Sequence, residues 1–277
     1  MAIKCTRVVR TPMGSGSEGS SLSWDDDIAR SKLSDVEKNG LQVFRNYKTS
    51  FERHATIQLV SEINSEPFDT RALGKLLDQV ATDDARLVPV VACAFADDVL
   101  RAMFKARAPV EALGGRAGLL SPLGPLGDFF KRLQLSHMFD MISADLAVEF
   151  NRLREARNKV SHSWDAEVIG EFFLRGKLAE MFPVEAIMAE REDWGQILPS
   201  LNPLQVFRIR VIWLLGRLAY EAPLYARIRD AQLPPGNVLY GDLKPERLGQ
   251  IMNVVGSAGS LVVRAKKREA GHQSHPS

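Results

Sequence analysis

The residues best suited to chemistry are Arg157, Asn158 and His162, which close an otherwise apolar helical pattern. One helix face of that pattern is formed by Leu146, Phe150, Leu153, Arg157 and Val160, spaced four, three, four and three residues apart. Arg157 therefore falls on the apolar face. A guanidinium there needs a carboxylate, carbonyl groups or an anion, because an unpaired buried charge is costly.

One chemistry that fits these three residues is metal-independent cleavage of RNA. His162 would act as general base or acid at a ribose hydroxyl or leaving oxygen. Arg157 would stabilise charge on the phosphoryl group, and Asn158 would orient the phosphate or His162. Arg157 and His162 are five residues apart, about 140° on an ideal helix. A two-fold dimer could bring two copies of the motif across one cleft.

The same residues also fit a structural role. Arg157 would pair with Asp97 or Asp98 on another helix and lock the bundle, while His162 would sit at a helix C-terminus, where a cation is favourable. Arg154 and His137 are possible additions to a basic cleft, although each is an ordinary surface or core residue when taken alone.

The elements that must position this motif are mostly helical. Periodicity and turn residues predict helices over 25–47, 50–63, 69–81, from an N-cap at 82–84 to about 106, 127–139, 143–162, 165–181, 184–192, 203–220 and 245–254. Pro223 is expected to end the 203–220 helix. We expect an all-α fold, a helical bundle over 23–165 with a C-terminal helical extension over 166–263. The tails 1–22 and 264–277 are predicted to be disordered.

Composition narrows the class of protein. In 277 residues, 36 basic and 34 acidic side chains nearly cancel, which argues against a strongly basic nucleic-acid binder. Cys5 and Cys93 are the two cysteines, and they can build neither a disulfide framework nor a zinc site. We expect a cytoplasmic protein with no membrane span, metal or cofactor, and no recognisable sequence-specific DNA-binding module.

Several short patterns occur together over residues 69–164. They are Asp83-Asp84, Pro125-Leu126-Gly127, Phe129-Phe130-Lys131-Arg132-Leu133, Ile142-Ser143 and the run from Arg154 through Arg157-Asn158 to His162. In order and spacing, this stretch resembles the mannitol operon repressor family of bacteria. That family usually carries a Gly near the end of the Phe-x-x-Arg helix, where this chain has Asp140. The resemblance implies a transcription-regulatory protein that acts through protein association.

The Arg-Asn-x-x-x-His ending is also similar to the signature of HEPN domains, which are helical bundles, often dimeric. Many are metal-independent endoribonucleases, and others are inactive scaffolds. This resemblance implies a toxin-related or defence-related ribonuclease that uses Arg157, Asn158 and His162 on RNA. The leading prediction is the regulatory protein, as a homodimer or with a partner protein. The alternatives are the ribonuclease and a helical scaffold without catalysis.

Overall fold

The computed structural model describes residues 23–109, 111, 114–160 and 201–272. All regular elements in these ranges are helices, which confirms the all-α prediction. The chain divides into two compact units, residues 1–54 and 55–277, which are described separately.

The first unit consists of α1 (Asp26–Ala29) and the first part of α2 (Asp35–Ser65). A capping box begins α2, because the Ser34 backbone N–H donates to the Glu37 carboxylate at 2.8 Å while the Ser34 hydroxyl lies 3.5 Å from the Glu37 N–H. The Asp25 N–H donates to Gln42 at 2.8 Å, and Arg45 pairs with Asp25 at 2.7 Å. The segment around α1 therefore covers a polar face of α2.

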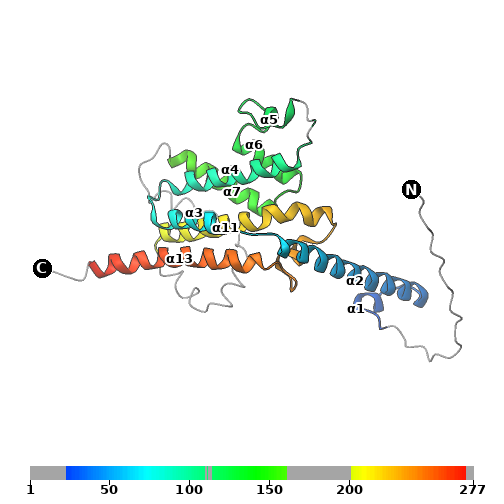
Figure 1. Ribbon diagram of the computed structural model, residues 1–277. Coiled ribbons are helices and arrows are strands. Elements are labelled where there is room, and N and C mark those ends of the chain that lie inside the picture. The colour runs from blue at the N-terminus through cyan, green and yellow to red at the C-terminus, as the bar shows by residue number, and fades with distance from the viewer. Residues whose placement is uncertain (1–22, 110, 112–113, 161–200, 273–277) are drawn as a thin grey trace. The chain divides into compact units, whose positions relative to one another are not determined.

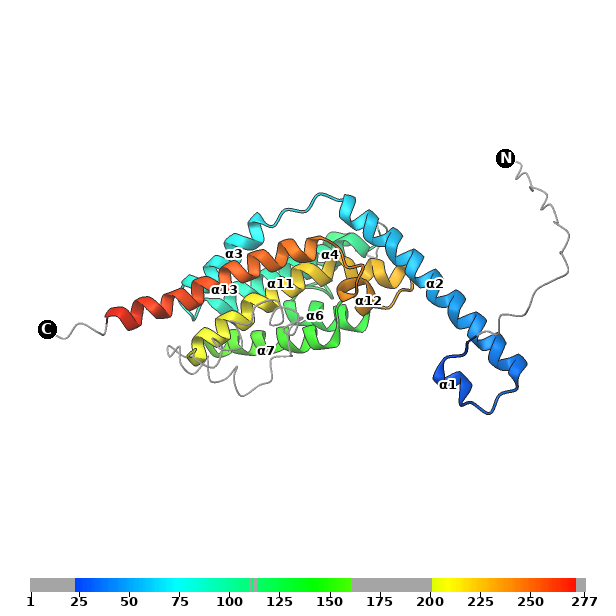
Figure 2. The same cartoon turned by 90° about the horizontal axis from the view of Figure 1, so that it is seen from below.

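The second unit is built around α11, a helix of 28 residues. Its helices are the end of α2, α3 (Arg71–Thr82), α4 (Val88–Arg107), α5 (Gly115–Leu119), α6 (Phe129–Met138), α7 (Ala144–Val160), α11 (Pro203–Asp230), α12 (Pro235–Tyr240) and α13 (Arg247–His272). α11 contacts α3, α4, α7, α12 and α13. Figures 1 and 2 show α11 running between α13 on one side and α7 on the other.

Close packing holds α11 against α13. A Cβ atom on Gly216 would overlap the side chain of Val255, so the two helix backbones approach more closely here than larger side chains would allow. Trp213, Leu215 and Leu218 of α11 are buried in the same cluster as Ile251 and Val255 of α13. Burial of this kind is the main favourable contribution to folding.

One large hydrophobic cluster joins helices from both sides of residue 165. It includes Leu77 of α3, Ala96 of α4 and Leu153 of α7 together with Phe207 of α11 and Ala258 of α13. Among the described residues, the C-terminal helices thus share a core with the earlier ones. The predicted boundary at 165, the predicted helices at 165–181 and 184–192, and the tail 1–22 lie outside the described residues.

Two predicted helix ends are wrong. Pro223 lies inside α11, which continues to Asp230 because Leu224 and Ile228 are buried beyond the proline. The last helix begins at Arg247 and runs to His272, so residues 264–272 are helical although the sequence predicts disorder there. The two predicted helices at 25–47 and 50–63 are largely replaced by the single helix α2, which runs from Asp35 to Ser65.

The predicted N-cap at 82–84 is also wrong, because α4 begins at Val88 with Pro89 in its first turn. Asp84 instead binds Arg86, and hydrogen bonds from Arg86 lower the pKa of Asp84 to about 2. At the end of α6, Asp140 has a φ of 52°. That left-handed conformation favours glycine, and Asp is among the few other residues that adopt it readily.

Candidate functional site

The predicted motif lies at the end of α7, and the structure places two of its three residues. Arg157 is half-buried and Asn158 is exposed. An Arg157 Nη2 donates to Asn158 Oδ1 at 3.5 Å, so the two side chains lie together at the surface. His162 lies outside the described residues.

The environment of Arg157 extends toward α4. Burial raises the pKa of the Cys93 thiol to about 12, and the positive charges of Arg157 and Arg154 oppose that rise. Arg154 stacks over the ring of Phe130 at 4.4 Å and donates to Asn151 at 3.0 Å. Arg154 is therefore held by neighbours of α6 and α7 rather than simply solvated. His137, the other proposed addition to a cleft, is exposed on α6.

Asp97, one of the two carboxylates suggested as partners of Arg157, binds a different arginine, Arg132. Asp97 of α4 accepts two hydrogen bonds from Arg132 of α6, each at 2.7 Å, and the Arg132 side chain is only 5% exposed. The Arg132 guanidinium also donates a hydrogen bond to the Leu126 carbonyl oxygen. The buried arginine that ties α4 to α6 is thus Arg132. Its position in the Phe129-x-x-Arg132 pattern was visible in the sequence, but its partner was not.

A second polar centre, which the sequence did not predict, joins α7, α11 and α12. Arg217 Nε donates to Glu221 at 2.5 Å, and Arg217 also pairs with Asp145. Tyr240 donates its hydroxyl to Glu221. Burial raises the pKa of Tyr240, and the Glu221 carboxylate raises it further. Ser143, which directly precedes α7, lies 3.1 Å from Arg217, so its hydroxyl belongs to this centre.

An apolar surface lies on the first part of α2. We call it the α2 face; its members are Val36, Val43, Phe44, Tyr47 and Phe51. On a helix with about 100° per residue, these positions fall within an arc of about 100°. Phe44, Tyr47 and Phe51 are 63%, 71% and 61% exposed.

The α2 face is on the opposite side of the helix from the residues that hold α1. Asn39, Gln42 and Arg45 bind the segment around α1, whereas the aromatic side chains are open to solvent. The first unit therefore covers the polar side of α2 and exposes its apolar side. This arrangement is unusual, because helices of folded proteins normally bury the apolar face.

Two kinds of feature, a metal-binding cluster and a membrane-spanning helix, are absent from the described ranges. They contain no group of three or more His, Cys, Asp or Glu side chains that could hold a metal ion. Likewise, none of the helices in these ranges is long and apolar enough to cross a membrane. Comparison of the chain with family models, curated proteins and solved structures finds no match.

Proposed function

We propose that the protein acts through association with a second copy of itself, and that the α2 face is the contact surface. The observation that carries this proposal is the exposure of three aromatic side chains on one side of one helix. An aromatic side chain buries roughly 200 Å² when fully covered. At about two-thirds exposure, the three rings present roughly 400 Å² of apolar surface, the size at which exposed patches mark interaction sites.

The order of residues along α2 favours pairing with a copy of the same helix running in the opposite direction. With Val43 and Phe44 at the two-fold axis, Val36 of one copy faces Phe51 of the other. Gly40 then faces Tyr47. No atom lies within 4 Å of a Cβ built on Gly40, so this position can receive a ring from a partner. Small residues opposite large ones allow two helices to interdigitate.

Charges beside the α2 face support the same orientation. Glu37 and Lys48 flank the same edge of the face, and the Lys48 side chain is 63% exposed. In an antiparallel pair, this edge of one helix lies beside the same edge of the partner helix. Glu37 of each chain therefore approaches Lys48 of the other, which gives two such contacts. In a parallel pair, this edge would instead lie beside the other edge of the partner's α2 face, where Asn39 and Asn46 are located. Charge complementarity thus selects a second copy and sets its direction.

The regulatory role implied by the resemblance to the mannitol operon repressor family is part of this proposal. A regulator that works through protein association needs an exposed apolar surface, and the α2 face supplies one. A non-catalytic scaffold would use the same surface. The ribonuclease alternative rests on Arg157, Asn158 and His162, and its support is that Arg157 and Asn158 lie together at the end of α7.

Sedimentation equilibrium of the full chain, from about 1 to about 100 µM, tests the association. The buried area is below that of a stable obligate dimer, so we expect a monomer–dimer equilibrium in the micromolar range. The double variant Phe44→Ser/Tyr47→Ser should weaken dimerisation at least tenfold. Phe139→Ser is the matched control, because Phe139 is 62% exposed but lies after α6.

Charge reversal tests the orientation. Glu37→Lys and Lys48→Glu should each weaken the dimer, and the two together should restore it. A wild-type chain that stays monomeric, or a dimer that survives the Phe44→Ser/Tyr47→Ser change, would overturn the proposal. RNA cleavage in EDTA by a monomer, lost in His162→Ala, would replace association with the ribonuclease function.

A further inference from the structure

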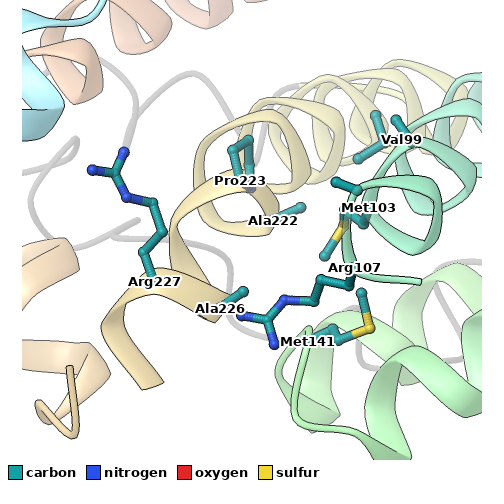
Figure 3. Close-up of a pocket in the computed structure, with 10 residues that line it drawn as sticks. Val99, Met103, Arg107, Met141, Ala222, Pro223, Ala226 and Arg227 are labelled. Atoms are coloured by element: carbon teal, nitrogen blue, oxygen red, sulfur yellow. The ribbon is translucent and has the colours of Figure 1, made fainter. Parts of the chain in front are cut away.

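A cavity of about 500 Å³ opens between α4 and α11 in the second unit. Its wall is mostly apolar and is formed by Val99, Met103, Met141, Ala222, Pro223 and Ala226. Figure 3 shows the α4 side chains facing those of α11 across the space, with Met141 closing one end. This volume falls within the range of small-molecule sites in proteins.

The cavity lies at the seam between two hydrophobic clusters. Met141 belongs to a small cluster with Phe104, and Met103 packs against both this cluster and the large one. On α11, Ala222 and Ala226 are too short to fill the gap. Apolar walls that face an unfilled space lose contacts that an apolar ligand can supply.

The charged residues that line the cavity are Arg107 and Arg227, and their guanidinium groups point in different directions. Figure 3 shows the Arg107 guanidinium reaching toward Ala226 at the edge of the space, while that of Arg227 points away. Arg227 is held by Glu66 at 2.5 Å. Arg107 is therefore the cation placed to meet a ligand in the cavity.

The bond that holds Arg107 is easy to exchange. Arg107 Nη2 lies 2.7 Å from a carboxylate oxygen of Asp230, and the two side chains are 42% and 69% exposed. Exposed ion pairs of this kind contribute little to stability, because water competes for both charges. A ligand carboxylate anchored by an apolar body in the cavity can thus replace Asp230 on Arg107, with two parallel hydrogen bonds.

We infer that the cavity binds a small carboxylic acid with a hydrocarbon body. At about 30 Å³ for each water-sized group, the volume has room for about 17 such groups, which is enough for a straight-chain acid of about ten carbon atoms. The hydrocarbon lies against the alanines, the proline and the two methionines, and the carboxylate binds Arg107. This binding is separate from the α2 face and does not depend on dimerisation.

Calorimetric titration of the full chain with decanoate and with decanol tests the inference. Wild type should bind both, and Arg107→Ala should weaken decanoate about tenfold or more while leaving decanol unchanged. Arg101→Ala is the matched control, because Arg101 is exposed on the same helix but does not line the cavity. Ala226→Phe should abolish binding of both compounds by filling the space.

Three results would overturn the inference. If decanoate does not bind the wild type, the cavity is not a binding site for such acids. If Arg107→Ala and Arg101→Ala bind decanoate with equal affinity, the ligand carboxylate does not bind Arg107. Decanoate binding that persists in Ala226→Phe, with helix content unchanged by circular dichroism, places the ligand elsewhere.

Discussion

α2 and α11 are the two longest described helices, with 31 and 28 residues, and they differ in what covers them. In α11, buried residues occur on every side, from Phe207 to Ile228, because helices of the same chain surround it. In the first part of α2, the apolar side is exposed. Helical periodicity thus shows which side of a helix is apolar, but it does not show whether residues of the same chain bury that side.

The charged groups of these two helices show the same contrast. Arg217 and Glu221 of α11 are 8% and 1% exposed and depend on each other inside the protein. Arg45 of α2 and its partner Asp27 are 38% and 68% exposed, so water can replace either one. The Arg217–Glu221 pair and the Arg45–Asp27 pair therefore contribute very differently to stability.

The largest expected effect comes from breaking the buried pair. Glu221→Ala leaves Arg217 with only one of its two carboxylate partners, Asp145, and leaves Tyr240 without its acceptor. We expect the free energy of unfolding to fall by about 3–5 kcal/mol, measured by urea unfolding with circular dichroism. For Asp27→Ala, the matched change in the first unit, the loss in free energy of unfolding should be smaller than the error of the measurement.

A double variant sharpens this comparison. Because the buried guanidinium of Arg217 would keep only the Asp145 carboxylate, removing its charge as well should recover part of the loss, and Arg217→Met combined with Glu221→Leu should be more stable than Glu221→Ala alone. If Glu221→Ala costs no more than Asp27→Ala, the centre of α11 is as solvated as the surface of α2, and the contrast between the helices fails.

Two glycines should respond to alanine with opposite signs. Gly216→Ala forces the new methyl group against Val255, and the overpacking exceeds the gain in helix propensity, for a net loss of about 1 kcal/mol. Gly40→Ala meets no neighbouring atom and should stabilise the dilute monomer by about 0.5–1 kcal/mol. Urea unfolding of both variants checks the signs, and a loss in Gly40→Ala would show that the α2 face is already covered.

The sequence predicts the buried face of α7 correctly up to Leu153 and then misses the burial of Ala156. Leu146, Phe150 and Leu153 are buried as expected, but Ala156 is the buried residue of the following turn, whereas Arg157 is half-buried. The reason is that alanine carries little hydrophobic signal, so the larger side chains decide which face appears apolar. A candidate site that depends on one turn of a helix is sensitive to this ambiguity.

Partners across long distances in the chain were beyond sequence reasoning. Arg217 binds Asp145, 72 residues earlier, and nothing in the local pattern of either helix indicates the other. Pro223 shows the same limit, since burial of Leu224 and Ile228 carries α11 past a residue that normally ends a helix. Helix existence depends on local pattern, while helix ends and polar contacts depend on packing with distant residues.

The smallest expected effect is a pH dependence at Asp145. Burial by itself raises the pKa of Asp145, but hydrogen bonds from Arg217 and Ser143 and the Arg217 charge outweigh it and hold the pKa below 3.8, the ordinary value. The folded state therefore releases this proton more readily than the unfolded state. The resulting stability is complete above about pH 4 and is lost as the pH falls through the lower, folded-state value.

Asp145→Asn isolates this contribution, because asparagine cannot titrate. The Asp145 side chain is 42% exposed, so solvent screening limits the effect to below about 1 kcal/mol. Between about pH 5 and about pH 3, wild type should lose more unfolding free energy than Asp145→Asn, measured by urea unfolding across that range. Parallel curves for the two proteins would mean that Arg217 is held by Glu221 alone, which would confine the buried centre of α11 to a single ion pair.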